Sequence, residues 1–187
     1  GRGTLAPGVL GWGVRYGIDL HGIGVLVGWP YAWQAGEMMD IELAIHYTKT
    51  LLKPFEGLRL KPYLCSAGVA TIGWGATFYE DGRRVKLSDP AITAERAEEL
   101  LDHMVGSVFM PKVIELCPGI KTPQQLGALT DFAFNVGVNA LKNSTLRKKV
   151  NTEDWEGAKK EILKWNKGGG KVLSGLTKRR ISESILL

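Results

Sequence analysis

Glu56 is an isolated carboxylate at the start of the segment FEGLRLKPYLCSAGVATIGWGAT, which spans residues 55–77. The next carboxylate along the chain is Glu80, and the side chains of Cys65 and Thr71 lie between the two. One carboxylic acid that keeps its proton can protonate the leaving oxygen of a glycosidic bond, while a second group delivers water or a nucleophile to the opposite face. A structural alternative is equally open at this point: Glu56 caps the preceding helix or forms an ion pair at its end.

The cysteines and histidines do not indicate a metal site. Cys65 and Cys117 are too few for a disulfide framework and lack metal-ligand spacing. The three histidines, His21, His46 and His103, are scattered along the chain. We therefore expect reduced thiols, no metal and no cofactor.

The chain has 187 residues and a net charge of +5, which is concentrated near the C-terminus. Residues 142–187 contain twelve Lys and Arg and five Asp and Glu. This length fits one domain, or one domain with an appendage. The basic surplus favours an anionic partner, either nucleic acid, anionic lipid or an acidic wall polymer, and the alternative is a solvated surface.

Glu56 is expected at the junction of a helix and a small sheet. Apolar residues at helical spacing predict a helix over residues 41–55 that stops before Glu56, with Pro54 near its end. Residues 60–78 are rich in β-branched and aromatic types and contain three glycines, which predicts two or three short strands. Residues 80–82 are typical of a turn.

The remainder of the chain is predicted to be helical. Thr93 caps a helix that ends near Pro111, and Thr122 with Pro123 starts another whose buried face includes Phe132. The further expected elements are a short helix from Asn143 or Ser144, a helix from Thr152 through Trp165, a loop at Gly168–Gly170 and a last helix over 173–187. The predicted class is α+β, a small sheet-bearing lobe and a larger helical lobe joined by the helix at 93–110.

Residues 1–39 differ in composition from the rest and are interpreted as a Gly-rich, weakly apolar N-terminal extension of a domain at 40–187. Residues 1–36 contain only three charges, yet their longest uncharged run is short for a membrane span and is broken by Pro30. They also lack the pattern of a cleaved secretory signal.

Four segments in the same order carry a resemblance to a known family. Eight residues separate Glu56 from Cys65 and five separate Cys65 from Thr71, which opens TIGWGAT. The other three segments are LTDFAFNVG at 129–137, STLRKKVN at 144–151 and WNKGGGKVLSGLTKRR at 165–180. Over about residues 40–187, the chain resembles the phage-type lysozymes, the muramidases of glycoside hydrolase family 24, in the branch with Cys at the third catalytic position.

The resemblance implies a lysozyme-like fold with a cleft between the lobes, and hydrolysis of the β-1,4 bond between N-acetylmuramic acid and N-acetylglucosamine in peptidoglycan. It also implies that Glu56 is the general acid, that Thr71 positions the attacking water, and that Cys65 takes the position that is Asp in many relatives. A free thiol is mostly protonated at neutral pH and is a poorer base than a carboxylate. Cys65 is therefore expected to act either as a thiolate favoured by nearby positive charge, for which Arg59 and Lys61 are near in sequence, or as a polar spacer.

Other residues of the matched segments are candidates for substrate binding. Tyr63 and Trp74 offer aromatic faces that suit sugar rings, and Asn135 is expected to line the cleft; both aromatic residues also fit a core role. Arg179 and Arg180 are candidates for an ion pair with Glu56 or for covering a helix end.

The expected partner is peptidoglycan and not nucleic acid, and the isolated domain is expected to be a monomer. Two alternative functions are kept: a lytic transglycosylase that leaves anhydro products, and a wall-binding structural module of a phage particle. Three interpretations of residues 1–36 also stay open: a releasable membrane anchor of an endolysin, with Cys65 masked by a disulfide until release; a connection to a larger virion protein; or a segment that packs on the domain. In all three the site of action is the periplasm or wall of the bacterial host, reached from the host cytoplasm, from a membrane-tethered state or from the virion.

Overall fold

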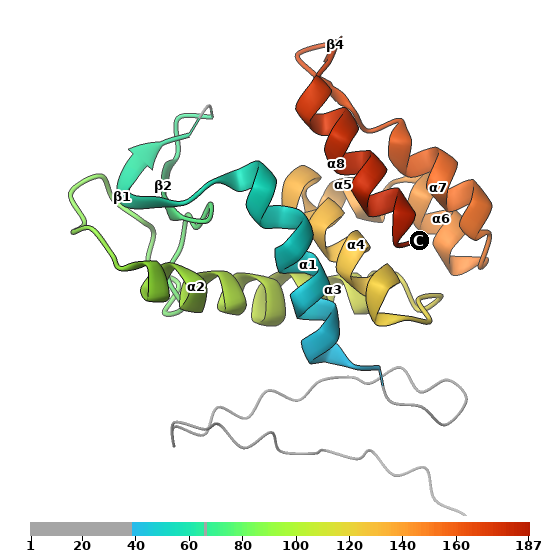
Figure 1. Cartoon of the computed structure of the whole chain (residues 1–187), viewed down its shortest axis with the longest axis horizontal. Helices are drawn as coiled ribbons and strands as arrows, with labels where there is room; N and C mark the ends of the chain where they lie inside the picture. The colour runs from blue at the N-terminus through green and yellow to red at the C-terminus, as the bar shows by residue number, and fades with distance from the viewer. Residues whose placement is uncertain (1–38, 66) are drawn as a thin grey trace, which may run out of the picture. The chain divides into compact units, whose positions relative to one another are not determined.

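The computed structural model describes residues 39–65 and 67–187, and all of these belong to one compact unit (Figure 1). The elements in chain order are α1 (Ile41–Glu56), β1 (Arg59–Leu64), β2 (Ala70–Gly73), α2 (Ala94–His103), the π-helical η1 (Met104–Phe109), α3 (Met110–Leu116), α4 (Pro123–Val136), α5 (Val138–Lys142), α6 (Thr145–Asn151), α7 (Trp155–Leu163), β3 (Lys167–Gly168), β4 (Lys171–Val172) and α8 (Ser174–Ile185). The expected extension at 1–39, apart from Met39, lies outside the described residues, as do the interpretations of residues 1–36. None of the helices in 39–65 and 67–187 has the length and apolar character to cross a membrane.

Helix α1 starts at the cap residue Asp40, whose carboxylate accepts a hydrogen bond from the amide of Leu43 at 2.9 Å. The prediction that this helix stops before Glu56 is wrong, because it continues through Pro54 and Glu56 is its last residue. Proline removes one helical hydrogen bond, but this close to the end the helix still closes with the amide of Gly57 donating to the carbonyl of Lys53. Glu56 is thus held on a rigid helix rather than on the following loop.

Strands β1 and β2 pair antiparallel, with Tyr63 opposite Thr71 and Leu64 opposite Ala70. The predicted small sheet is confirmed, with further isolated bridges from Ile72 to Ala76 and from Phe78 to Arg84. The turn expected at 80–82 is present. The sheet has its own small core, in which the buried side chains are Ile72, Ala76, Val85 and Leu100.

The helix predicted at 93–110 is longer than expected. Thr93 caps α2 as predicted, its hydroxyl accepting from the amide of Arg96 at 3.1 Å. Pro111 does not lie near the end, because the π-helical turn η1 leads directly into α3, which contains it. In η1 the amide of Met110 donates to the carbonyl of Val105, five residues back, and this wider spacing accommodates a proline in an otherwise continuous helical run.

Helix α4 lies at the centre of the helical lobe, and every residue from Gln125 to Ala133 is buried. It starts with a capping box in which the side chains of Thr122 and Gln125 each accept from the other's backbone amide. The large core of this lobe is built from α1, α3, α4, α6 and α7 around Phe132, Leu129 and Leu126. Figure 1 shows α4 between α1 and the group formed by α6, α7 and α8.

Three details of the helical lobe differ from the sequence prediction. Ser144 caps α6, as one of the two alternatives had it, but α7 starts after Asp154 and not at Thr152. The short helix α5 had no prediction. The glycine loop at 168–170 is the turn of a two-residue β-hairpin, β3 with β4, in which Gly169 and Gly170 have positive φ values of 55° and 77°.

Candidate active site

Glu56 lines a cavity of about 420 Å³ that three helices form together. The last turn of α1 supplies Phe55 and Glu56, the end of α4 supplies Asn135, and the start of α8 supplies the remaining lining residues, which are Leu173, Ser174, Gly175, Leu176 and Arg179. The side chain of Glu56 is 25% exposed, so its carboxyl group is accessible from this cavity.

Arg179 holds the Glu56 carboxylate in place. Its Nη1 donates to Glu56 Oε1 at 2.7 Å, while its Nη2 and Nε donate to the two carboxylate oxygens of Asp131 at 2.7 and 3.0 Å. Arg179 is 3% exposed and Asp131 is fully buried. Burial lowers the pKa of Arg179, but the hydrogen bonds and charges of Asp131 and then of Glu56 outweigh burial and raise it. The sequence-based ion pair between Arg179 and Glu56 is therefore present.

Arg180 does not reach Glu56 and instead belongs to the buried cluster behind it. Its Nη2 donates to Glu183 Oε1 at 2.6 Å, and its guanidinium lies 5.0 Å from the ring centre of Phe132. Burial, followed by the hydrogen bond and negative charge of Asp131, raises the pKa of Glu183 well above its ordinary value. The ion-pair hypothesis thus holds for one of the two arginines.

The segment that follows β2 approaches the Glu56 carboxyl at Gly75, and Tyr63 of β1 interacts electrostatically with Glu56. A Cβ atom at Gly75 would lie only 3.6 Å from Glu56 Oε2, and the residue has a φ of 100°, which favours glycine. Burial and then the negative charge of Glu56 raise the pKa of Tyr63, and the Cys65 thiol adds a smaller effect in the same direction. Tyr63 pairs with Thr71 across the sheet and interacts electrostatically with Glu56 and Cys65. Tyr63 therefore links the three predicted catalytic residues.

Cys65 directly follows β1 and is half-buried, and Thr71 is 3% exposed in β2. The Thr71 hydroxyl donates to the carbonyl of Val69 at 2.9 Å. Hydrogen bonds from the backbone of Val69 and then of Ala67 lower the pKa of the Cys65 thiol. The thiolate is thus favoured by hydrogen bonds rather than by Arg59, whose guanidinium stacks 5.0 Å from the Tyr63 ring centre. Cys65 and Cys117 are both free thiols.

The predicted substrate-binding residues occupy different environments. Asn135 lines the cavity, and its buried Oδ1 has no hydrogen-bond partner among the described residues, so it is available to a donor on a ligand. Tyr63 is half-buried and interacts electrostatically with Glu56, but it does not line this cavity. Trp74, in contrast, points toward α2, where its Nε1 donates to Glu98 at 2.9 Å and the Lys53 ammonium lies 5.3 Å from its ring centre. For Trp74 this arrangement favours the core role, and its contact with sugar stays a prediction.

Sequence reasoning missed Asp131 and Glu183. The signal for Asp131 was an acidic residue within the apolar run LTDFAFNV, where an unpaired buried charge would be costly. The signal for Glu183 was its position four residues after Arg179, one helical turn along α8.

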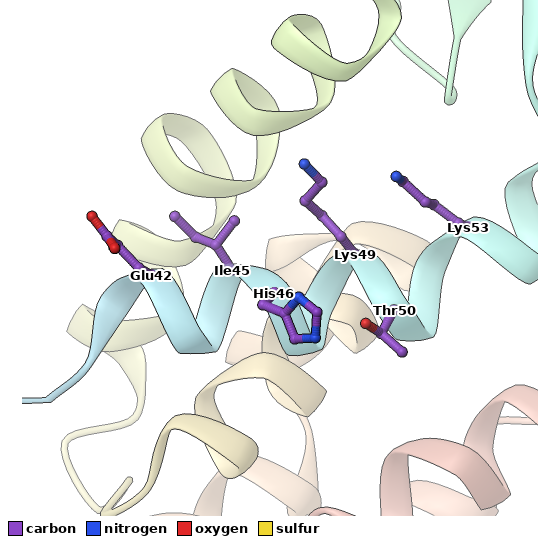
Figure 2. Close-up of a pocket in the computed structure, with 6 residues that line it drawn as sticks. All are labelled: Glu42, Ile45, His46, Lys49, Thr50 and Lys53. Carbon is purple, nitrogen blue, oxygen red and sulfur yellow. The ribbon is translucent and has the colours of Figure 1, made fainter. Parts of the chain in front are cut away.

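A second pocket, of about 380 Å³, lies along α1, and Figure 2 shows its side chains. The residues shown are Glu42, Ile45, His46, Lys49, Thr50 and Lys53. Both lysines already have partners on α2: Glu98 lies 3.2 Å from Lys49 Nζ and 2.7 Å from Lys53 Nζ. This groove therefore offers no free cation to a ligand, and the candidate chemistry is at Glu56.

Comparisons with known proteins agree with this geometry. A family model described as phage lysozyme matches residues 53–183. The endolysin of Bacillus phage B103 is 42% identical over 138 residues, 73% of this chain and 50% of the relative. The endolysin of Acyrthosiphon pisum secondary endosymbiont phage 1 is 39% identical over 143 residues, 73% of this chain and 91% of the relative. Proteins named SAR-endolysin, among them that of Escherichia phage Mu, match at 32–33% identity over about 71% of this chain.

The fold is shared with solved structures. An endolysin from Escherichia coli O157:H7 phage FAHEc1 superposes with a TM-score of 0.67 at 30% identity, covering 82% of this chain and 95% of the other. The lysozyme-like α+β fold expected from the sequence is thereby confirmed. The chain spans about half the length of the Bacillus phage B103 endolysin and nearly all of the FAHEc1 structure. On the matched residues and the shared fold, the chain belongs to the phage lysozyme family.

Proposed function

We propose that this chain hydrolyses the β-1,4 bond between N-acetylmuramic acid and N-acetylglucosamine in peptidoglycan, and that a phage uses it to lyse the bacterial wall. Membership of the phage lysozyme family makes the domain a glycoside hydrolase. The observation that carries the proposal is the position of Glu56, a helix-anchored carboxyl that is accessible from a cavity and held by a buried arginine.

Glu56 acts as the general acid. Its Oε1 is fixed by Arg179 at 2.7 Å, so Oε2 is the oxygen free to carry the proton toward the leaving oxygen of the sugar. Fixing the carboxyl in one orientation removes a conformational cost from the transition state. General acid catalysis of this kind contributes roughly 10²- to 10⁴-fold to a rate.

Thr71 positions the attacking water and Cys65 accepts its proton. The Thr71 hydroxyl donates a hydrogen bond to the carbonyl of Val69, so its oxygen lone pairs are available to accept a hydrogen bond from a water molecule. The lowered pKa of the Cys65 thiol increases the thiolate fraction, and a thiolate can take the proton that the water loses. This arrangement favours a base role for Cys65 over that of a spacer.

The substrate contacts come from Asn135 and Tyr63. The unpartnered Oδ1 of Asn135 suits a hydroxyl or amide donor on a sugar, and Tyr63 offers a half-buried ring and interacts electrostatically with Glu56. The net charge of +5 fits an anionic wall polymer.

Analysis of the products distinguishes this function from its alternatives. Purified peptidoglycan is digested with the wild-type chain, and the released muropeptides are identified by mass. Hydrolysis leaves reducing ends, whereas a lytic transglycosylase leaves anhydro ends that are lighter by one water, and a wall-binding module releases nothing. The relatives reported above are named endolysins, which favours neither alternative.

The place of action proposed for the protein is the bacterial wall. For residues 1–36 we keep the releasable anchor, the virion connection and the packed segment as separate hypotheses. Flotation with lipid vesicles of the chain with and without residues 1–36 tests the first, since an anchor is expected to float only when those residues are present. Equal behaviour of the two chains would exclude an anchor.

A further inference from the structure

Asp131 is a buried acid that the catalytic roles above do not use. It lies on α4, has no exposed surface, and is not among the residues that line the cavity at Glu56. Its two carboxylate oxygens accept two of the three hydrogen bonds that Arg179 makes, at 2.7 and 3.0 Å. A buried carboxylate is costly unless it is paired, so an acidic residue in the buried stretch of α4 calls for a reason.

The geometry around Arg179 explains why an acidic residue stands at position 131. The guanidinium is planar and presents its donors in a fixed fork, so two bonds to Asp131 determine the direction of the remaining Nη1 donor. That donor is the one bonded to Glu56. Asp131 therefore sets where Arg179 meets the acid, although Asp131 does not line the cavity itself.

Charge adds a second consequence. An unbalanced cation beside Glu56 favours its carboxylate form, which cannot donate a proton. A buried anion on the far side of the same guanidinium offsets much of that attraction. The remaining ionisable groups nearby are Arg180 and Glu183 from α8 and Tyr63 from β1. Glu183 accepts a hydrogen bond from Arg180, lies 3.9 Å from Arg179 Nε and interacts with Asp131, whereas Tyr63 interacts with Glu56.

We propose that Asp131 is a positioning residue for the general acid: through its two hydrogen bonds to Arg179 it orients the Glu56 carboxyl and balances the charge of the guanidinium. This inference rests on the proposed role of Glu56. Asp131 acts on the reaction through Arg179 and Glu56 and does not line the cavity itself.

The test is the pH profile of kcat for hydrolysis of purified peptidoglycan. Asp131→Asn alone leaves Glu183, 3.9 Å from Arg179 Nε, as a partial replacement for the lost anion. In Asp131→Asn combined with Glu183→Gln, Arg179 faces Glu56 without a balancing anion, so the alkaline limb of the profile is expected to move about one to two pH units lower, and by less in Asp131→Asn alone. At the midpoint of the wild-type limb the shift in the combined variant corresponds to a loss of about 5- to 50-fold. The matched control is Thr130→Val, a similarly sized change at the next buried position of α4, where the hydroxyl has no hydrogen-bond partner among the described residues; its profile is expected to match wild type.

Each other outcome has a defined meaning. A profile of Asp131→Asn combined with Glu183→Gln whose alkaline limb coincides with wild type, with or without a uniform drop in rate, overturns the inference, because a structural role alone lowers the rate at every pH. If the combined variant does not fold, Asp131→Glu provides the test. It keeps the negative charge but shifts the two hydrogen bonds to Arg179, so the alkaline limb should keep its position and kcat should fall about tenfold. A wild-type kcat in this variant overturns the inference. Glu56→Gln is measured alongside to separate the role of Asp131 from the proposed role of Glu56. Activity in Glu56→Gln rejects the proposed role of Glu56 as the general acid, on which the inference about Asp131 rests.

Discussion

Replacing Arg179 by Met is predicted to destabilise the domain strongly, because it removes the countercharge of a fully buried carboxylate. Arg179 gives two charged hydrogen bonds to Asp131 and one to Glu56. Hydrogen bonds to charged groups contribute about 1.5–3 kcal/mol each, and breaking a buried ion pair from one side costs about 3–5 kcal/mol. We expect a loss of about 3–5 kcal/mol in the free energy of unfolding, or roughly 6–20 °C in Tm for a domain of this size.

Urea denaturation at pH 7, followed by circular dichroism, measures this loss. The control is Lys159→Met, which removes an exposed ion pair with Glu156 and should change stability by less than about 0.5 kcal/mol. The double variant Arg179→Met with Asp131→Asn should recover part of the stability, since the unpaired buried charge is gone. A loss below about 1 kcal/mol in Arg179→Met, or no recovery in the double variant, would refute the reasoning.

Three further predictions concern reactivity and packing. At pH 7 iodoacetamide should label Cys65, whose pKa is lowered, and leave Cys117 unlabelled, because burial raises the pKa of Cys117 to about 12. Mass spectrometry of the native protein should therefore show one adduct, and two adducts would contradict this prediction. Gly127→Ala should destabilise the contact between α1 and α4 by about 1–3 kcal/mol despite the better helix propensity of Ala, because its Cβ would lie 2.6 Å from the Cβ of Tyr47; an unchanged urea midpoint would contradict it. Thr122→Ala should lower stability by about 1 kcal/mol through loss of the capping box on α4, measured by thermal unfolding, and a stability equal to wild type would show that the cap contributes nothing.

The candidate catalytic segment could be proposed from the sequence because its signal is local. The spacing of Glu56, Cys65 and Thr71, the helix before them and the strands around them all lie within about forty residues. The caps at Thr93, Thr122 and Ser144 were also predictable, because a cap is a contact with an amide three residues away.

The environment of the acid could not be predicted in the same way. Arg179 lies 123 residues after Glu56, so the sequence could name it only as one of two candidates. Asp131 lies 48 residues before Arg179, and its pairing depends on how α4 packs against α8. The hydrogen bonds that lower the pKa of Cys65 come from the short loop between β1 and β2, where local sequence had suggested cations instead.

The extent of α1 shows a different limit. A proline near the end of an apolar pattern predicts that the helix ends before Glu56, whereas α1 continues to Glu56. The tertiary contacts of Leu51 and Leu52, both buried in the core, outweigh the one hydrogen bond lost at Pro54. The practical consequence is that the acid is held on a helix, which positions it more rigidly than a loop would.

The most direct test of the account is the rate at which Glu56→Gln releases reducing ends from purified peptidoglycan. The control is Glu42→Gln, a change of the same kind in the first turn of the same helix. If Glu56 is the general acid, its variant should keep a cooperative thermal transition and lose at least about 100-fold in rate, while Glu42→Gln stays near wild type. A folded Glu56→Gln variant with a rate within about threefold of wild type would contradict the central claim.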